Sequence, residues 1–154
     1  MSQRKAPDLP PFWVRRLSTF TSIQGNIAMK PILVVQNEPM MTTLLCHRLT
    51  MNGHSVLTAI DGRSALDLVS WARPKLVLVD MLLPDMRGLD VLSRLKHQPA
   101  TADVPVMMLL PYAHEGDTVA ALESGAHDCL VKPIQPRELV ARIAGALSRQ
   151  KVAA

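Results

Sequence analysis

The sequence predicts an open α/β domain in which a doubly wound, five-stranded parallel sheet carries helices on both faces. Two observations predict this fold class. Short, continuous apolar runs recur along the chain, as is typical of strands buried on both sides of a parallel sheet. Amphipathic helical patterns separate these runs, so that strand and helix alternate five times. The five runs are Ile32–Val35, Ser55–Leu57, Leu76–Val79, Val106–Leu110 and Cys129–Val131.

The helices are predicted from apolar residues spaced three and four positions apart, which share one helix face. The turns Asn52-Gly53 and Asp61-Gly62 separate elements, and Pro136 suits the first turn of the last helix. The weakest pattern follows Gly116. In chain order, the stripes are Leu44, Leu45 and Leu49; Ala65, Leu68, Val69 and Ala72; Leu89, Leu92 and Leu95; Val119, Ala120 and Leu122; and Leu139, Val140, Ile143 and Leu147.

Length and composition fit one domain, because the chain has 154 residues, of which 48% are hydrophobic and 19% charged. No apolar run approaches the length of a membrane span, so a membrane location is not expected. The two cysteines, Cys46 and Cys129, cannot build a disulfide framework, and no secretory signal is visible. We therefore expect a cytoplasmic protein.

The domain is expected over residues 29–150, between a basic extension at 1–28 and a short tail at 151–154. Residues 1–28 carry a net charge of +3 out of the chain's +4, so the predicted domain is nearly neutral. A basic charge confined to an extension does not indicate nucleic-acid binding. Three interpretations of residues 1–28 stay open: a disordered extension, a start site at Met29, or a short basic amphipathic element around Phe12–Leu17.

In open α/β sheets the functional site lies beyond the carboxyl ends of the strands. The residues that follow the predicted strands are therefore the candidates for a site. They are Gln36, Asn37 and Glu38 after the first run, Asp80 after the third, Leu110 and Pro111 at the end of the fourth, and Lys132 with Pro133 after the fifth.

Three segments resemble the receiver domain of two-component response regulators: Ile32–Pro39, Leu78–Asp80 with Pro84 and Gly88, and Gly125–Pro133. The similarity extends from about Lys30 to Arg149. It implies a flavodoxin-like fold with strand order 2-1-3-4-5 and a role in bacterial two-component, or phosphorelay, signalling. Because this order places the first and third strands side by side, Asn37 and Asp80 are expected to be neighbours.

The same resemblance implies which residues would carry the chemistry. Asp80 takes the phosphoacceptor position, and Lys132 the position that pairs with the phosphoryl group, followed by a peptide bond to Pro133 that is expected to be cis. The sequence departs from the family at the remaining positions. The two metal-binding acids are replaced by Gln36 and Asn37; the hydroxyl residue is Leu110, the small residue after it Pro111, and the aromatic switch position Cys129.

These departures predict a site with low affinity for a divalent cation. A family site holds three carboxylates and one lysine, whereas Asp80 and Lys132 sum to zero, so we expect a direct ion pair between them. Mg²⁺ prefers hard oxygen ligands, usually carboxylates. Asp80 and Asn37 are the expected ligands of any weakly held metal; Gln36 could contribute only through water, and Glu38 is expected to face away. No cofactor is expected, and Met40 and Met41 are candidates to cover the vacated pocket.

We expect a stand-alone, atypical receiver that is not an enzyme and acts by protein–protein binding, with Asp80 phosphorylated weakly or not at all. Its partner would be a histidine kinase, a response regulator, an output protein or a second copy. By family analogy, the contact surface would be the fourth helix, fifth strand and fifth helix. Because about five residues follow the last helical stripe, no DNA-binding module is expected.

Two alternatives remain. A conventional receiver would accept a phosphoryl group on Asp80 from a histidine kinase. A small-ligand or flavin-binding enzyme on the same fold is disfavoured, because Gln36–Met41 contains no glycine or serine for a phosphate loop. Neither G-x-x-x-x-G-K-S/T nor G-x-G-x-x-G occurs in the chain.

Overall fold

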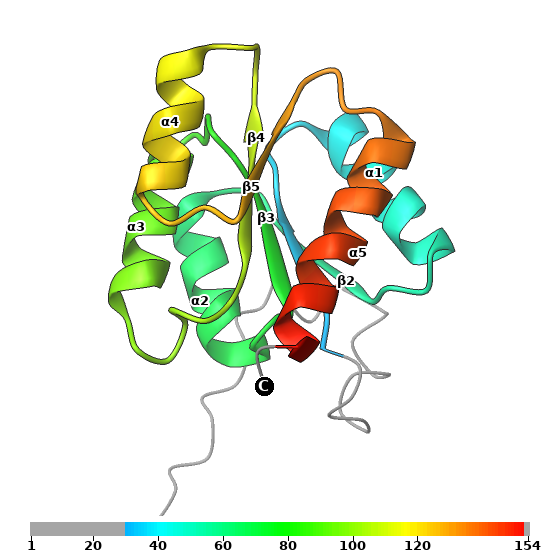
Figure 1. Ribbon diagram of the computed structural model, residues 1–154, viewed down its shortest axis with the longest axis horizontal. Helices are drawn as coiled ribbons and strands as arrows, with labels where there is room; N and C mark the ends of the chain where they lie inside the picture. The colour runs from blue at the N-terminus through cyan, green and yellow to red at the C-terminus, as the bar shows by residue number, and fades with distance from the viewer. Residues whose placement is uncertain (1–29, 153–154) are drawn as a thin grey trace, which may run out of the picture.

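The computed structural model describes residues 30–152, in which five parallel strands and five helices alternate (Figure 1). The strand order is β2-β1-β3-β4-β5, which confirms the predicted fold class and topology. The expectations for residues 1–28 fall outside the described residues. The elements are β1 (Ile32–Val35), α1 (Pro39–Met51), β2 (Val56–Ala59), α2 (Gly62–Ala72), β3 (Leu76–Asp80), α3 (Gly88–His97), β4 (Val106–Leu110), α4 (Glu115–Glu123), β5 (Asp128–Val131) and α5 (Pro136–Val152).

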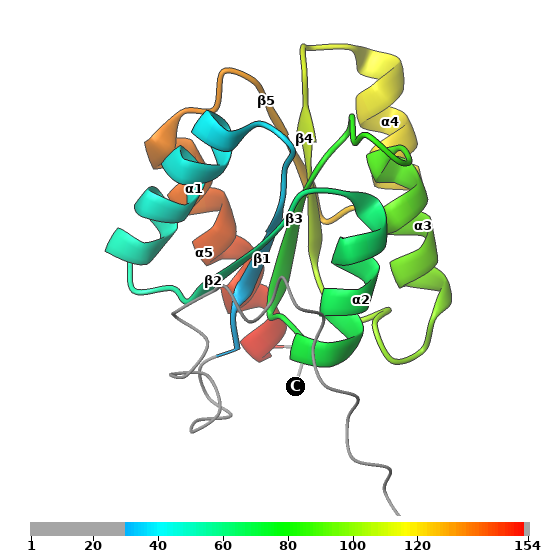
Figure 2. The same ribbon diagram turned by 180° about the vertical axis from the view of Figure 1, so that it is seen from behind.

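The helices cover the two faces of the sheet unequally: α1 and α5 lie on one face, and α2, α3 and α4 on the other (Figures 1 and 2). Successive strand residues point to opposite faces, so each buried strand contributes to two cores. In β1, Ile32 and Val34 pack with α1 and α5. Leu33 and Val35 pack with the other three helices. Burial on both faces explains the continuous apolar runs that predicted the strands.

The predicted boundaries agree with the observed elements to within two residues at every strand end. The main difference lies at the end of α5, which continues through Val152 and so extends into the segment expected to be a tail from residue 151. The apolar stripe had ended at Leu147, and a polar last turn gives no periodic signal. Within residues 30–152, no helix combines the length and apolar character needed to cross a membrane.

The loop after β3 is held against the sheet and against α2. Gly88 donates its N–H to the Met81 carbonyl at 2.8 Å, and a Cβ at position 88 would collide with the Asp80 carbonyl oxygen. Asp85 accepts N–H bonds from Gly62 and Arg63 at 2.8 and 2.9 Å, at the start of α2. These contacts position the carboxyl end of β3, where the candidate site lies.

Candidate functional site

Side-chain alternation brings three polar residues together at the carboxyl ends of three strands. In β1, β3 and β5 alternate residues pack into the core beneath α1 and α5. Two residues beyond the last of these core residues in each strand come Gln36, Asp80 and Lys132. Their side chains therefore point to that same face of the sheet. Strands β1 and β3 pair directly, with Val35 opposite Val79, so Gln36 comes opposite Asp80.

The Asp80 carboxylate is buried, with 2% of the residue exposed, and it accepts three hydrogen bonds. Lys132 Nζ lies 2.5 Å from Asp80 Oδ2, so the predicted direct ion pair is present. Gln36 Nε2 donates to the same oxygen at 2.7 Å. The backbone N–H of Leu82 donates to Oδ1 at 2.9 Å. One ammonium group therefore balances the carboxylate charge, and both oxygens have donors.

Gln36 is the partner that sequence reasoning missed, because its expected contribution was limited to water-mediated contact. Its Oε1 accepts the N–H groups of Asn37 and Glu38 at 2.9 and 3.2 Å. Since these two donors require an oxygen on that side, the NH₂ group must face Asp80. A carboxylate at position 36 could not donate in this way. The side chain thus occupies the space beside the acceptor oxygen and fixes it.

The acidic-pocket positions differ in their contacts. Gln36 donates a hydrogen bond to the Asp80 carboxylate, whereas Asn37 is exposed. The prediction that Met40 and Met41 cover the pocket is wrong, because Met40 is 81% exposed and Met41 packs with the α1–α5 core. Gln36, 3% exposed, fills that space instead. Glu38 is exposed at the N-cap of α1.

The donor set around Asp80 does not fit a magnesium site. Mg²⁺ needs oxygen ligands in a near-octahedral arrangement, usually with more than one carboxylate or with substrate phosphates. Here a single carboxylate already accepts an ammonium and an amide N–H on the same oxygen. Within residues 30–152, no group of three His, Cys, Asp or Glu side chains gathers as a metal site.

The switch positions belong to the opposite face of the sheet. Leu110 is fully buried and packs in the core beneath α2, α3 and α4, while Pro111 is half-buried. Cys129 packs against the same core, and burial, followed by the Asp128 charge, raises the pKa of its thiol. The residues at both switch positions therefore pack as core residues beneath α2, α3 and α4.

The backbone nevertheless joins the switch strand to the site. The N–H of Lys132 donates to the carbonyl of Leu110 at 2.9 Å, next to the paired residues Leu110 and Val131. The peptide bond between Lys132 and Pro133 is cis, as expected. Lys132 is thus held by its backbone to β4 and by its side chain to β3.

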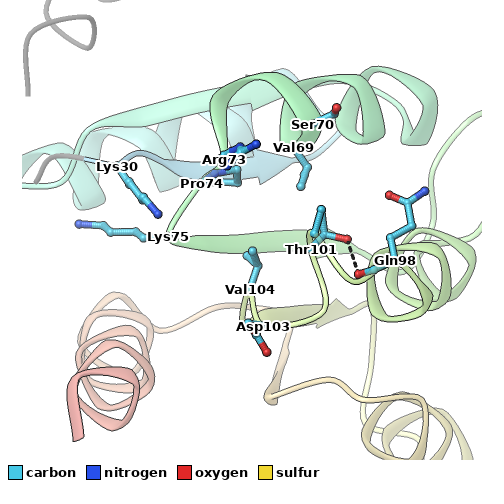
Figure 3. A pocket seen from close by; sticks show the side chains of 11 residues that line it. Lys30, Val69, Ser70, Arg73, Pro74, Lys75, Gln98, Thr101, Asp103 and Val104 are labelled. Atoms are coloured by element: carbon cyan, nitrogen blue, oxygen red, sulfur yellow. Dashed lines mark hydrogen bonds between the residues drawn. The ribbon is translucent and has the colours of Figure 1, made fainter. Parts of the chain in front are cut away.

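A pocket of about 340 Å³ lies at the opposite end of the strands from Asp80, where β1 and β3 begin (Figure 3). Lys30 and Lys75 lie at one end of it, and Thr101 lies beside Gln98 at the other. Asp80 lies at the other end of β3, at its carboxyl end. Three lining cations, of which Arg73 is the third, also lie near the carboxyl end of α2, whose dipole favours positive charge.

Comparison with known proteins agrees with the observed fold. Residues 32–144 match the response regulator receiver domain family. The alkaline phosphatase synthesis transcriptional regulatory protein PhoP of Bacillus subtilis is 39% identical over 125 residues, which cover 81% of this chain and 51% of PhoP. The phosphate regulon transcriptional regulatory protein PhoB of Escherichia coli is 39% identical over 118 residues, covering 77% of this chain and 52% of PhoB.

Among solved structures, a CheY-like response regulator receiver domain protein from Methanospirillum hungatei superposes with a TM-score of 0.76 at 26% identity, over 82% of this chain and 99% of that one. The chain spans about half the length of the two curated relatives. The likeness to them therefore concerns the receiver portion of each.

Proposed function

Because the chain belongs to the response regulator receiver domain family, we propose that it works mainly as a binding module whose Asp80 is phosphorylated weakly or not at all. One observation carries this proposal: Asp80 Oδ2 is bonded to both Lys132 and Gln36. In a phosphoryl transfer to aspartate, a carboxylate oxygen must attack the phosphorus in line. Oδ2 already accepts two donors and must lose at least one of them before it attacks, and Oδ1 accepts the N–H of Leu82.

Charge supports the same proposal. The incoming phosphoryl group brings negative charge on its equatorial oxygens, which must be neutralised in the transition state. Lys132 is the one cation at this site among the described residues, and it is already paired with Asp80. We infer that Mg²⁺ binds weakly, because Gln36 and Asn37 replace the acids that would hold it.

The expected response to phosphorylation is also weakened. Leu110 offers no hydroxyl to a phosphoryl oxygen, and its side chain packs in the core on the other face of the sheet. Pro111 fixes its own backbone φ and restricts Leu110. We infer that the loop after β4 keeps one conformation. Output would then come from a constant surface rather than from a switch.

We place the contact with a signalling partner on α4, β5 and α5. Val119, Leu122 and Val131 are exposed there, at 43, 48 and 38%. Exposed apolar side chains on these elements suit contact with a protein partner better than contact with solvent. The partner would be a histidine kinase, another response regulator, an output protein or a second copy of this chain.

A conventional phospho-accepting receiver is the second candidate. Relatives at 39% identity favour it, and so does the retention of Asp80 and Lys132. Both relatives are named as transcriptional regulatory proteins. We therefore limit the expected absence of nucleic-acid binding to residues 32–144, the part that matches the receiver family.

The intact mass of the chain after incubation with a small-molecule phosphodonor and Mg²⁺ separates the two candidates. The binding-module proposal expects no phosphate-sized gain in the folded parent protein. An Asp80→Asn chain is the negative control, and a Gln36→Asp, Asn37→Asp chain is the positive control with restored acids. A gain in the parent that disappears in Asp80→Asn would establish the conventional receiver and overturn the proposal.

A further inference from the structure

A shallow apolar groove of about 630 Å³ runs along the solvent side of α1. Met40, Met41, Leu44 and His47 line it from successive helix turns, and Glu38 lies at its amino-terminal end. Met40 is 81% exposed and Leu44 50% exposed, although both are large apolar residues. The volume lies within the range of protein ligand pockets, and methionines suit surfaces that adapt to a partner.

This groove is separate from the site described above. Gln36 and Lys132 contact Asp80 at the carboxyl ends of the strands, whereas the groove faces outward from α1. Leu44 also borders the narrow space between α1 and α5 that Ile134 and Leu139 line. An apolar segment bound in the groove would therefore also reach the apolar residues between α1 and α5.

The chain itself contains a segment of matching chemistry. Residues 12–20 read Phe-Trp-Val-Arg-Arg-Leu-Ser-Thr-Phe. Trp13, Leu17 and Phe20 are spaced i, i+4 and i+7, the spacing with which a helix presents one apolar face to a groove. Arg15 and Arg16 add two positive charges. Glu38 at the end of the groove supplies a carboxylate for them.

The connection is long enough. Nine residues, 21–29, join the segment to Lys30 at the amino end of β1. Fully extended, nine residues reach about 30 Å at roughly 3.3 Å each. Helix α1 has 13 residues and so is about 20 Å long at 1.5 Å per residue. The groove covers the first turns of this helix, so the tether spans the distance with slack.

We propose that residues 12–20 of this chain bind in the α1 groove, with Trp13, Leu17 and Phe20 on Met40, Met41 and Leu44 and an arginine near Glu38. Tethering makes the contact intramolecular, so that a weak apolar interaction is populated without a partner. The segment then covers the α1 surface and competes with any other protein for it.

Trp13 reports on the contact directly, because the chain has only two tryptophans. The emission of Trp13 is obtained as the difference between the full chain and its Trp13→Phe variant, so that Trp71 stays intact. We expect a blue-shifted emission that iodide quenches poorly. Leu44→Arg in the full chain should shift this emission to that of a water-exposed indole. Leu122→Arg on α4 is the matched control, since Leu122 is 48% exposed against 50% for Leu44.

Three outcomes would overturn the proposal. Trp13 could be as accessible to iodide in the parent as free tryptophan. Its emission could be unchanged by Leu44→Arg and equally by Met40→Arg, the second groove variant. Its burial could disappear on dilution, which would place the segment on a second copy. A blue shift that is independent of concentration and lost in both groove variants, but not in Leu122→Arg, supports it. Circular dichroism of each variant confirms that the domain is folded.

Discussion

Truncating the Asp80 side chain distinguishes this site from a carboxylate-rich one. In a cluster of three carboxylates and one lysine, removing an acid relieves repulsion between like charges. Here Asp80 is the single carboxylate in contact with Lys132 and Gln36, and the pair is neutral. Asp80→Ala therefore leaves an ammonium group and a buried amide without their acceptor. We expect the variant to be less stable than the parent.

The magnitude follows from the hydrogen bonds that an alanine at position 80 cannot accept. Hydrogen bonds to charged groups contribute roughly 1.5–3 kcal/mol each, and the carboxylate accepts two from side chains. The Lys132 side chain is 22% exposed, so water recovers part of its interaction. We expect a decrease of about 3 kcal/mol in the free energy of unfolding, which for a domain of this size lowers Tm by roughly 10 °C.

Urea unfolding followed by circular dichroism measures this difference. Asp67→Ala is the control, because Asp67 is an exposed residue of α2. Its effect should stay within about 0.5 kcal/mol, as for ordinary surface substitutions. An Asp80→Ala chain as stable as the parent, or more stable, would refute the assignment of Asp80 to a neutral, satisfied network.

Three further outcomes are expected. Gln36→Glu places a second carboxylate against Asp80 and raises the pKa of the pair, so the variant should be less stable than the parent at pH 7 and regain stability on acidification. A pH profile of unfolding that runs parallel to that of the parent would contradict this. Burial, and then the neighbouring Lys75, lowers the pKa of His54, so the folded state favours the neutral ring. The contribution of His54 to stability is therefore present above about pH 6.5 and is lost as the pH falls. His54→Gln should flatten the stability profile between pH 7 and 5. Gly88→Ala would drive a Cβ into the Asp80 carbonyl oxygen, so thermal unfolding should show a clear decrease in Tm, and an unchanged Tm would mean that the loop shifts freely.

The fold could be predicted because its signals are local and repeated. Continuous apolar runs occur where strands are buried on both faces, and the alternation with helices then leaves few topologies. The positions of Asp80 and Lys132 followed from the rule that sites lie at the carboxyl ends of parallel strands. Their ion pair could be expected from charge alone, and the structure contains it.

The roles of Gln36 and Asn37 could not be separated by the same rules. Periodicity identifies where a strand ends, but not which side chain of the following loop turns inward. One signal was available: Ile32, Val34 and Gln36 share a face, and so do Leu76, Leu78 and Asp80. The exposure of Met40 depends on which face of α1 packs against the sheet. The sequence of α1 is almost without amphipathic asymmetry and so does not indicate this face.

The measurement that tests the central claim most directly is a calorimetric Mg²⁺ titration of the parent chain beside the Gln36→Asp, Asn37→Asp chain. If Gln36 and Lys132 hold Asp80 in a neutral network, the parent should show no saturable binding below the millimolar range. The variant should bind Mg²⁺ more tightly, because it gains a carboxylate at position 36, which contacts Asp80, and a second one at the adjacent position 37. Saturable micromolar binding to the parent would contradict the account and make this receiver a conventional metal-dependent one.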